Sequence, residues 1–159
     1  MKSLLFKYSF IASFFLLIGC SSNEYYYLEF KDLEEGWSKN ESIKFNFLSK
    51  KSNYKIKILL RNDKKYPFSN IHLISKIYLN DKTITDTLDL DFENKKNDIF
   101  KKNNLSLKNY SFILKDSISL NKDSVSIEFK HASRYSYKSA PVDNLKGLLS
   151  VGLIVEELN

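Results

Sequence analysis

The sequence has few of the residues that build common catalytic motifs. It contains one cysteine, four glycines, two prolines and two histidines in 159 residues. A single cysteine excludes an internal disulfide, so a domain built from this chain depends on its core alone. Four glycines leave little room for a phosphate-cradling or dinucleotide-binding loop, and no Gly-x-Ser-x-Gly motif occurs. We therefore expect that the protein is not an enzyme.

Metal and nucleic-acid sites are also poorly supported. His72 and His131 have no second histidine or cysteine at metal-ligand spacing. The formal net charge is +6, but Arg61 and Arg134 are the only arginines, and arginine is the usual reader of bases and phosphates. We expect no cofactor, no metal and no nucleic-acid partner.

The sequence lacks a hydrophobic run long enough to cross a membrane, but its N-terminus has the pattern of an export signal. Lys2 and Lys7 flank the start of an uncharged apolar stretch over residues 8–18. A spanning helix needs roughly 20 apolar residues. The stretch ends in Leu17-Ile18-Gly19-Cys20, which resembles the bacterial lipobox, where cleavage precedes an acylated cysteine. We predict a cleaved lipoprotein signal peptide over residues 1–19 and attachment of lipid, such as palmitate, to the Cys20 thiol.

The remaining chain, about 140 residues long, fits one domain. From Ser42 onward its apolar residues alternate with polar ones, which is typical of strands with one buried face. The alternating sets are Ile43, Phe45, Phe47; Tyr54, Ile56, Ile58, Leu60; Ile71, Leu73, Ile77, Leu79; Ile84, Leu88, Leu90, Phe92; Tyr110, Phe112, Leu114, Ile118, Leu120; Val125, Ile127, Phe129; and Leu149, Val151, Leu153, Val155. No segment has a convincing helical period. We predict an all-β fold, an antiparallel β-sandwich of jelly-roll type.

The connections complete this predicted organisation. Ser52-Asn53, Asn80-Asp81-Lys82 and Asn121-Lys122-Asp123 predict hairpins. Residues 94–109 have weak periodicity and predict a long surface loop. We expect residues 20–41 to form a lipidated tether with a candidate edge strand at residues 25–30, and residues 42–159 to form the sandwich domain.

Acidic residues gather at residues 86–93, but the calcium-binding EF-hand pattern fails at Asn94 and Phe100. Alternation places Asp89 and Asp91 on the outward side, so we interpret them as part of a solvated strand face rather than a cation site. Asp86 falls in phase with the apolar residues, and we expect it at a sheet edge or paired with a donor.

Two further segments supply a candidate partner or ligand surface. Tyr66-Pro67-Phe68-Ser69-Asn70 precedes a long apolar strand, and its rings fit either the edge of the core or a contact surface. His131 falls in phase with an apolar strand face, which favours a satisfied, partly buried structural histidine over a catalytic one. The candidate surface consists of Tyr66, Phe68, Asn70, His131 and Arg134.

In this order, the motifs resemble one family, the gliding-motility lipoprotein GldH of the Bacteroidetes. The similar elements are the lipobox, Trp37 ahead of the strand at 43–47, the segment Tyr66-Pro67-Phe68-Ser69-Asn70-Ile71, the pair Asp86-Thr87, the segment His131-Ala132-Ser133-Arg134, and the glycine-containing run at 145–156. The chain departs from the family pattern at Ala132-Ser133 and Ser150, and residues 94–109 lack the glycines of that region.

The resemblance implies a non-catalytic accessory lipoprotein of the gliding machinery, which is linked to type IX secretion. It implies a lipid anchor on Cys20, an outer-membrane location in the cell envelope, and contacts with other gliding or secretion proteins. An alternative function is that of a carbohydrate-binding lipoprotein with a jelly-roll module. The many tyrosines of the chain suggest this alternative, and the partner would then be a glycan. A hydrolase would require His72 or His131 to meet carboxylates from distant strands.

Overall fold

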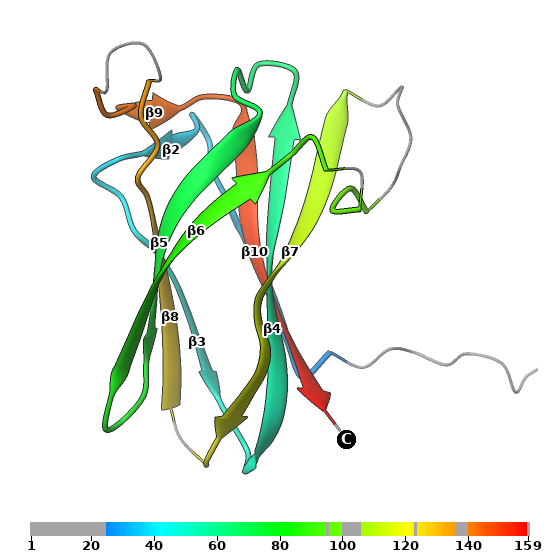
Figure 1. Ribbon diagram of the computed structural model, residues 1–159, viewed down its shortest axis with the longest axis vertical. Helices are drawn as coiled ribbons and strands as arrows, with labels where there is room; N and C mark the ends of the chain where they lie inside the picture. The colour runs from blue at the N-terminus through cyan, green and yellow to red at the C-terminus, as the bar shows by residue number, and fades with distance from the viewer. Residues whose placement is uncertain (1–24, 95, 100–105, 123, 136–139, 159) are drawn as a thin grey trace, which may run out of the picture.

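The chain folds into two packed four-stranded sheets (Figure 1). The computed structural model describes residues 25–94, 96–99, 106–122, 124–135 and 140–158. Within these residues the strands are β1 (Tyr27–Asp32), β2 (Trp37–Ser38), β3 (Ile43–Leu48), β4 (Ser52–Asp63), β5 (Asn70–Tyr78), β6 (Thr83–Asp91), β7 (Leu107–Leu120), β8 (Ser124–His131), β9 (Asn144–Leu145) and β10 (Leu148–Leu158). The first sheet has the order β1-β10-β4-β7 and the second β3-β8-β5-β6, while β2 pairs with β9. The strands pair antiparallel, which confirms the predicted antiparallel β-sandwich.

The pairing order is that of a jelly roll. β5 pairs with β6, β4 with β7, β3 with β8, β2 with β9 and β1 with β10, so each pair encloses the previous one along the chain. A single long antiparallel hairpin that rolls up and shares its strands between two sheets gives this nesting. The contacts of β10 with β4 and of β5 with β8 then complete the two sheets.

The alternating residues meet between the sheets and form the core. In β3, the side chains of Ile43, Phe45 and Phe47 are buried and those between them are exposed. The other predicted sets supply the fully buried residues Tyr54, Ile56, Ile58, Ile71, Leu73, Val125, Ile127, Phe129, Val151, Leu153 and Val155. Burial of each such side chain contributes roughly 1.5 to 3 kcal/mol relative to leaving it exposed. The period-two pattern of the sequence therefore predicted these core residues correctly.

The early part of the chain belongs to the same core. β1 pairs with β10 along its length and forms an edge of the first sheet. Trp37 in β2 is completely buried, and Leu33 is buried in the same apolar cluster. The segment predicted as a tether thus supplies an edge strand and core residues. Residues 20–24, including Cys20, and the predicted signal peptide over residues 1–19 lie outside the described residues.

Two of the three predicted hairpins are wrong. Asn80-Asp81-Lys82 does connect β5 to β6 within the second sheet. In contrast, Ser52-Asn53 begins β4, which lies in the opposite sheet from β3. Asn121 and Lys122 likewise follow β7 of the first sheet and precede β8 of the second, and Asp123 is not among the described residues. A short polar turn can lead to the facing sheet, because stacked sheets are only about 10 Å apart.

The long loop predicted at residues 94–109 ends earlier than expected. β7 begins at Leu107, inside that range. Before the loop reaches it, the Ile99 amide donates to the Asn109 carbonyl (2.9 Å), and Asp98 pairs with Tyr110 in an isolated bridge. Residue 95 and residues 100–105 are outside the described part of the chain.

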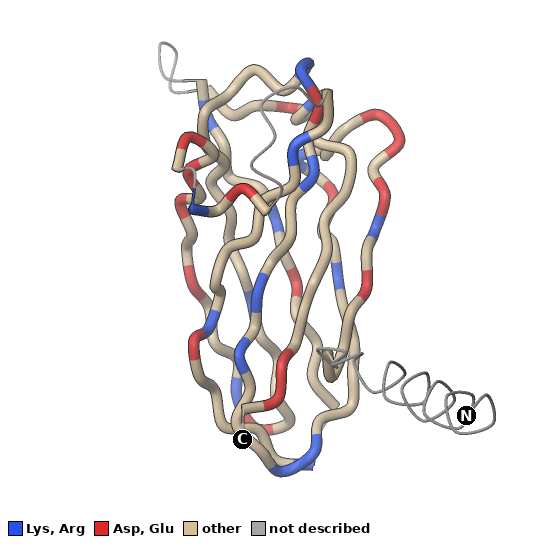
Figure 2. Tube along the Cα trace, turned by 90° about the vertical axis from the view of Figure 1, so that its right-hand side faces the viewer, with Lys and Arg blue, Asp and Glu red and all other residues tan. Residues whose placement is uncertain are grey.

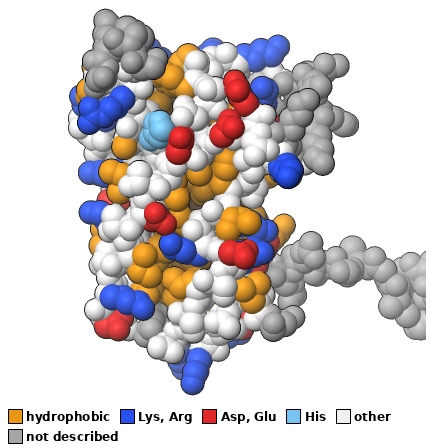
Figure 3. All heavy atoms as spheres, in the orientation of Figure 1, with side chains coloured by type: hydrophobic (Ala, Val, Ile, Leu, Met, Phe, Trp, Pro, Cys, Tyr) orange, Lys and Arg blue, Asp and Glu red, His pale blue; other side chains and the backbone are white. Residues whose placement is uncertain are grey.

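An ion pair spans the gap between two edge strands on one side of the sandwich. Lys115 Nζ on β7 lies 3.1 Å from Asp86 Oδ2 on β6, and each strand is the edge of its own sheet. This confirms that Asp86 lies at an edge with a donor. Asp89 and Asp91 are exposed on the outward face of β6, as predicted. Over this side of the molecule, hydrophobic side chains gather along the middle and charged ones lie across them (Figure 3).

Candidate interaction surfaces

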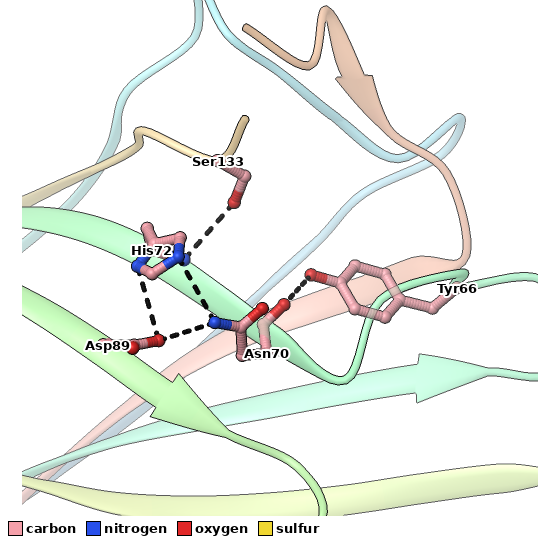
Figure 4. Close-up of polar contacts among 5 residues, drawn as sticks. All are labelled: Tyr66, Asn70, His72, Asp89 and Ser133. Carbon is pink, nitrogen blue, oxygen red and sulfur yellow. Dashed lines mark hydrogen bonds and ion pairs between the residues drawn. The ribbon is translucent and has the colours of Figure 1, made fainter. Parts of the chain in front are cut away.

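The Tyr66 turn is held by its own aromatic and polar contacts. Tyr66 is buried, and its hydroxyl donates to the Asn70 carbonyl at 2.9 Å (Figure 4). Its ring meets those of Phe68 and Phe92 edge-on, with centroids 5.6 and 5.4 Å away. Burial raises the pKa of Tyr66 above its ordinary value. The phenol is therefore a neutral structural donor that fixes the entry to β5.

A polar network follows this turn on the outward face of the second sheet. Asn70 Nδ2 donates to Asp89 Oδ1 (2.8 Å) and lies 3.2 Å from His72 Nε2, while His72 Nδ1 lies 3.3 Å from the same Asp89 oxygen (Figure 4). These distances fit hydrogen bonds from His72 Nδ1 to Asp89 and from Asn70 Nδ2 to His72 Nε2. Ser133 Oγ accepts from the His72 main-chain amide (3.3 Å), so it is not aligned with the imidazole as a nucleophile would be.

A cleft of about 470 Å³ opens beside the Tyr66 turn. Its aromatic lining consists of Tyr66, Phe68, Phe92 and Tyr110, and Lys64 and Lys108 are among its polar residues. Apart from half-buried Phe68, these rings are less than a tenth exposed, and they pack against one another. Most of the aromatic area beside the cleft is therefore buried against neighbouring rings.

His131 lies in the core against Trp37. It is 6% exposed, and its ring meets the Trp37 ring edge-on at 5.8 Å. Neither ring nitrogen has a hydrogen-bond partner within the described residues, so the histidine is buried but is not satisfied as the sequence predicted. Burial lowers the pKa of His131. The main chain of Trp37 lies close enough to the ring to oppose part of this shift, but it does not form a hydrogen bond with either ring nitrogen. The neutral imidazole acts as a packing group.

This burial predicts a pH-dependent stability. The pKa of His131 is lower in the folded protein than its ordinary value of 6.5, so below about pH 6.5 the unfolded chain binds the extra proton and stability falls as the pH falls. We expect His131→Leu to remove this acid loss, up to about 1.4 kcal/mol per pH unit. Urea unfolding at about pH 5 and pH 7.5 measures it. His72→Leu, at a half-buried position, is the matched control; equal pH profiles for wild type and His131→Leu would contradict the assignment.

The structure brings the two predicted segments together without forming one continuous surface. Tyr66 and His131 are buried, Phe68 and Asn70 are partly exposed, and Arg134 is exposed. The segments are neighbours because the Ala132 amide donates to the His72 carbonyl at 2.8 Å and the ring of Tyr135 lies 6.1 Å from that of Phe68. The contacts of His72, Asp89 and Tyr135 were not predicted from the sequence.

The outward face of the first sheet is apolar where a solvated face is normally polar. Strand register sets two rows across β1, β10, β4 and β7: Leu28, Ile154, Lys57 and Ile113, and Phe30, Gly152, Leu59 and Ser111. We use the term apolar face for the set of Leu28, Phe30, Leu59, Gly152, Ile154 and Ile113. Its outermost members, Leu28, Phe30 and Ile113, are 47%, 46% and 55% exposed.

Glycine and paired charges shape this apolar face. A Cβ on Gly152 would lie 2.7 Å from the Phe30 ring, so the ring rests directly on the glycine. Two lysines on this side of the sheet are paired: Lys57 Nζ, between Ile154 and Ile113 in the row, lies 2.7 Å from Glu156 Oε1, and Lys55 Nζ lies 2.9 Å from Asp116 Oδ1. Both of these lysines thus have a carboxylate partner within the domain.

The described residues contain no group of three or more histidine, cysteine, aspartate or glutamate side chains placed to hold a metal ion. Across the same residues, no helix is long and apolar enough to cross a membrane.

Comparisons with known proteins give a family match over most of the chain. A family model described as GldH lipoprotein matches residues 25–155. No curated protein matches the chain. Among solved structures, the chain is similar to CBM35 from Cellvibrio japonicus Abf62 (8% identity, TM-score 0.37, 89% of this chain and 86% of that one). It is similar to Xyl-CBM35 in complex with a glucuronic acid containing disaccharide (9%, 0.39, 89% and 88%). It also resembles a ruminal GH26 endo-beta-1,4-mannanase (14%, 0.38), with 87% of this chain matched but only 21% of the mannanase.

Proposed function

The chain belongs to the GldH family of gliding-motility lipoproteins, and on this premise we propose that it is an accessory protein of the gliding machinery that acts by protein contacts. In this proposal, lipid on Cys20 holds the jelly roll at the outer membrane, and the domain supports envelope components on which type IX secretion also depends. The family places the protein at the cell envelope as a lipoprotein.

The apolar face of the first sheet is the observation that carries the contact role. Leu28, Phe30 and Ile113 leave about half of each side chain in water on the outward face of the sheet. Because Lys55 and Lys57 are paired within the domain, the fitting partner is an envelope protein with a complementary apolar strip rather than a charged one. Burial of these side chains supplies the driving force for such a complex.

The polar residues support a contact role over catalysis. The His72, Asp89 and Asn70 side chains bind one another, and Ser133 binds main chain, so the described set lacks a free nucleophile beside a base. The carbohydrate-binding alternative has less support, because the tyrosines that prompted it include the buried Tyr54, Tyr66 and Tyr110.

Placing a charge on the apolar face is expected to impair function without unfolding the domain. Ile113→Asp introduces a carboxylate into the apolar face at a position that is 55% exposed and lies opposite Lys57 in register. The stability change should stay near 1 kcal/mol or below. We expect reduced colony spreading and reduced secretion of type IX cargo, together with loss of partners recovered by pull-down from detergent-solubilised envelopes.

Ile99→Asp is the matched control, since Ile99 is 49% exposed and lies outside the apolar face. Normal spreading and secretion in both strains would rule out the apolar face as the functional contact. In a parallel strain, Cys20→Ala should release the protein from the membrane fraction and reduce both activities. Wild-type motility and secretion in that strain would refute the anchored role.

A further inference from the structure

We propose that one end of the sandwich is a surface that contacts anionic lipid headgroups. This end, here called the lysine base, consists of Tyr25, Tyr26, Leu48, Lys50, Lys51 and Lys122. It is formed by the start of the described chain and by the connections from β3 to β4 and from β7 to β8. The inference rests on the proposed lipid attachment at Cys20, and it adds a second, non-covalent contact and an orientation.

Contacts among the connections make the lysine base one structure. The Tyr26 hydroxyl donates to the Leu48 carbonyl at 2.6 Å, and Lys50 Nζ lies 5.7 Å from the centre of the Tyr26 ring. Ser49 Oγ binds the carbonyl oxygen of Asn121, which ties the turn that carries Lys50 and Lys51 to the turn that carries Lys122.

Below these contacts, the Lys50 amide donates to the Tyr54 hydroxyl at 3.0 Å. The Tyr54 ring, fully buried, lies 5.0 Å from that of Tyr26. The core thus fixes the turn from beneath.

The exposed chemistry of the lysine base matches a membrane surface. Leu48 is 74% exposed, the largest value among the exposed large hydrophobic side chains of the described chain, and Tyr25 is 44% exposed. Lys50, Lys51 and Lys122 are all exposed. Tyrosine rings prefer the headgroup level, and lysines next to a bilayer are attracted to anionic lipids. Glu157, opposite Tyr54 on β10, adds one negative charge at the margin.

The chain length places this end against the bilayer. Four residues lie between Cys20 and Tyr25, so the two Cα atoms are five steps apart and at most about 17 Å from each other when the chain is fully extended. A lipid on Cys20 therefore holds Tyr25 and its neighbours close to the headgroups. The long axis of the sandwich carries the opposite end away from this base (Figure 1). Basic segments mark the lowest tip of the domain, and acidic segments lie just above it near the C-terminus (Figure 2).

Vesicle binding without the anchor tests the inference. Every described strand and the whole core lie between Tyr25 and Leu158, so a protein of residues 25–159 keeps the complete sandwich. We expect it to co-sediment with vesicles of phosphatidylethanolamine and phosphatidylglycerol, and less with phosphatidylcholine alone. The triple variant Lys50→Gln, Lys51→Gln, Lys122→Gln should bind the anionic vesicles roughly a hundredfold more weakly, at about fivefold per lysine.

The matched control removes three exposed lysines from the opposite end: Lys64→Gln, Lys65→Gln and Lys146→Gln. It should bind the anionic vesicles as the wild type does. No binding by the wild type, or equal weakening in both triple variants, would overturn the inference. Because the assay contains neither the lipid anchor nor a partner protein, its result is independent of the spreading and secretion phenotypes that test the proposed function.

Discussion

Trp37→Ala is expected to lower the thermal midpoint of unfolding by roughly 10 to 15 °C. Trp37 is completely buried, pairs with Leu145 between β2 and β9, and donates from Nε1 to the Glu41 carbonyl at 3.2 Å. Truncation of a buried tryptophan leaves a large cavity and costs about 3 to 5 kcal/mol. The edge contact with His131 is lost as well. Circular dichroism melts of the purified domain measure the shift.

Leu48→Ala is the control for this prediction, because Leu48 is 74% exposed. Its midpoint should stay within about 2 °C of the wild type, since surface substitutions usually change stability by less than 0.5 kcal/mol. Similar small shifts for both variants would mean that the segment around Trp37 is peripheral to the sandwich. A much larger fall in the midpoint for Trp37→Ala than for Leu48→Ala would instead show that residues 33–41 unfold together with the sandwich.

Period-two patterning predicted the strands and the core but not how the strands pair. In β3 and β4 the alternating apolar residues show which side chains face the core. They do not show to which of the two sheets each strand belongs, because both sheets have a core-facing side. Neighbouring strands in sequence therefore look like a hairpin whether they share a sheet or face each other. Only the nested pairing, in which distant partners such as β1 and β10 meet, assigns them to different sheets.

The apolar face had a signal in the sequence that alternation alone does not explain. Leu59 and Ile113 are apolar residues in the polar phase of β4 and β7, and residues 151–155 are buried without a break in β10. An uninterrupted buried run means that both sides of β10 are covered, one by the core and the other by the side chains of Leu28 and Phe30. Which outward residues line up depends on register, so the face appears only once the sheet is assembled.

The candidate site was predictable in its parts and not as a whole. Pro67 and the flanking rings indicated a shaped turn, and the structure has Tyr66 buried in it. The contact of this turn with the segment that follows β8 joins residues about sixty positions apart, through His72 and Ser133. His72 lies in the polar network on the outward face of β5 and Ser133 follows β8, so neither residue has a sequence neighbour that indicates this contact.

Gly147→Ala is expected to destabilise the domain by about 2 to 5 kcal/mol, because backbone strain and overpacking act together there. Gly147 has φ of 84°, a conformation that L side chains rarely adopt. A Cβ at this position would lie 2.2 Å from the Tyr66 main-chain nitrogen. The backbone cannot easily move away, since the Asp63 amide donates to the Gly147 carbonyl at 2.9 Å. Urea unfolding measures the loss.

Gly152→Ala is the matched control for this strain, because its new Cβ would instead meet the Phe30 side chain at 2.7 Å. Phe30 is 46% exposed and can swing outward, so the expected loss is about 1 kcal/mol. If the two alanine variants were equally stable, the close approach of the Tyr66 turn to Gly147 would have to be absent in solution. A large loss at Gly147 alone means that the β9 to β10 corner and the Tyr66 turn are built against each other, and that the glycine is required by the backbone contact rather than by any ligand.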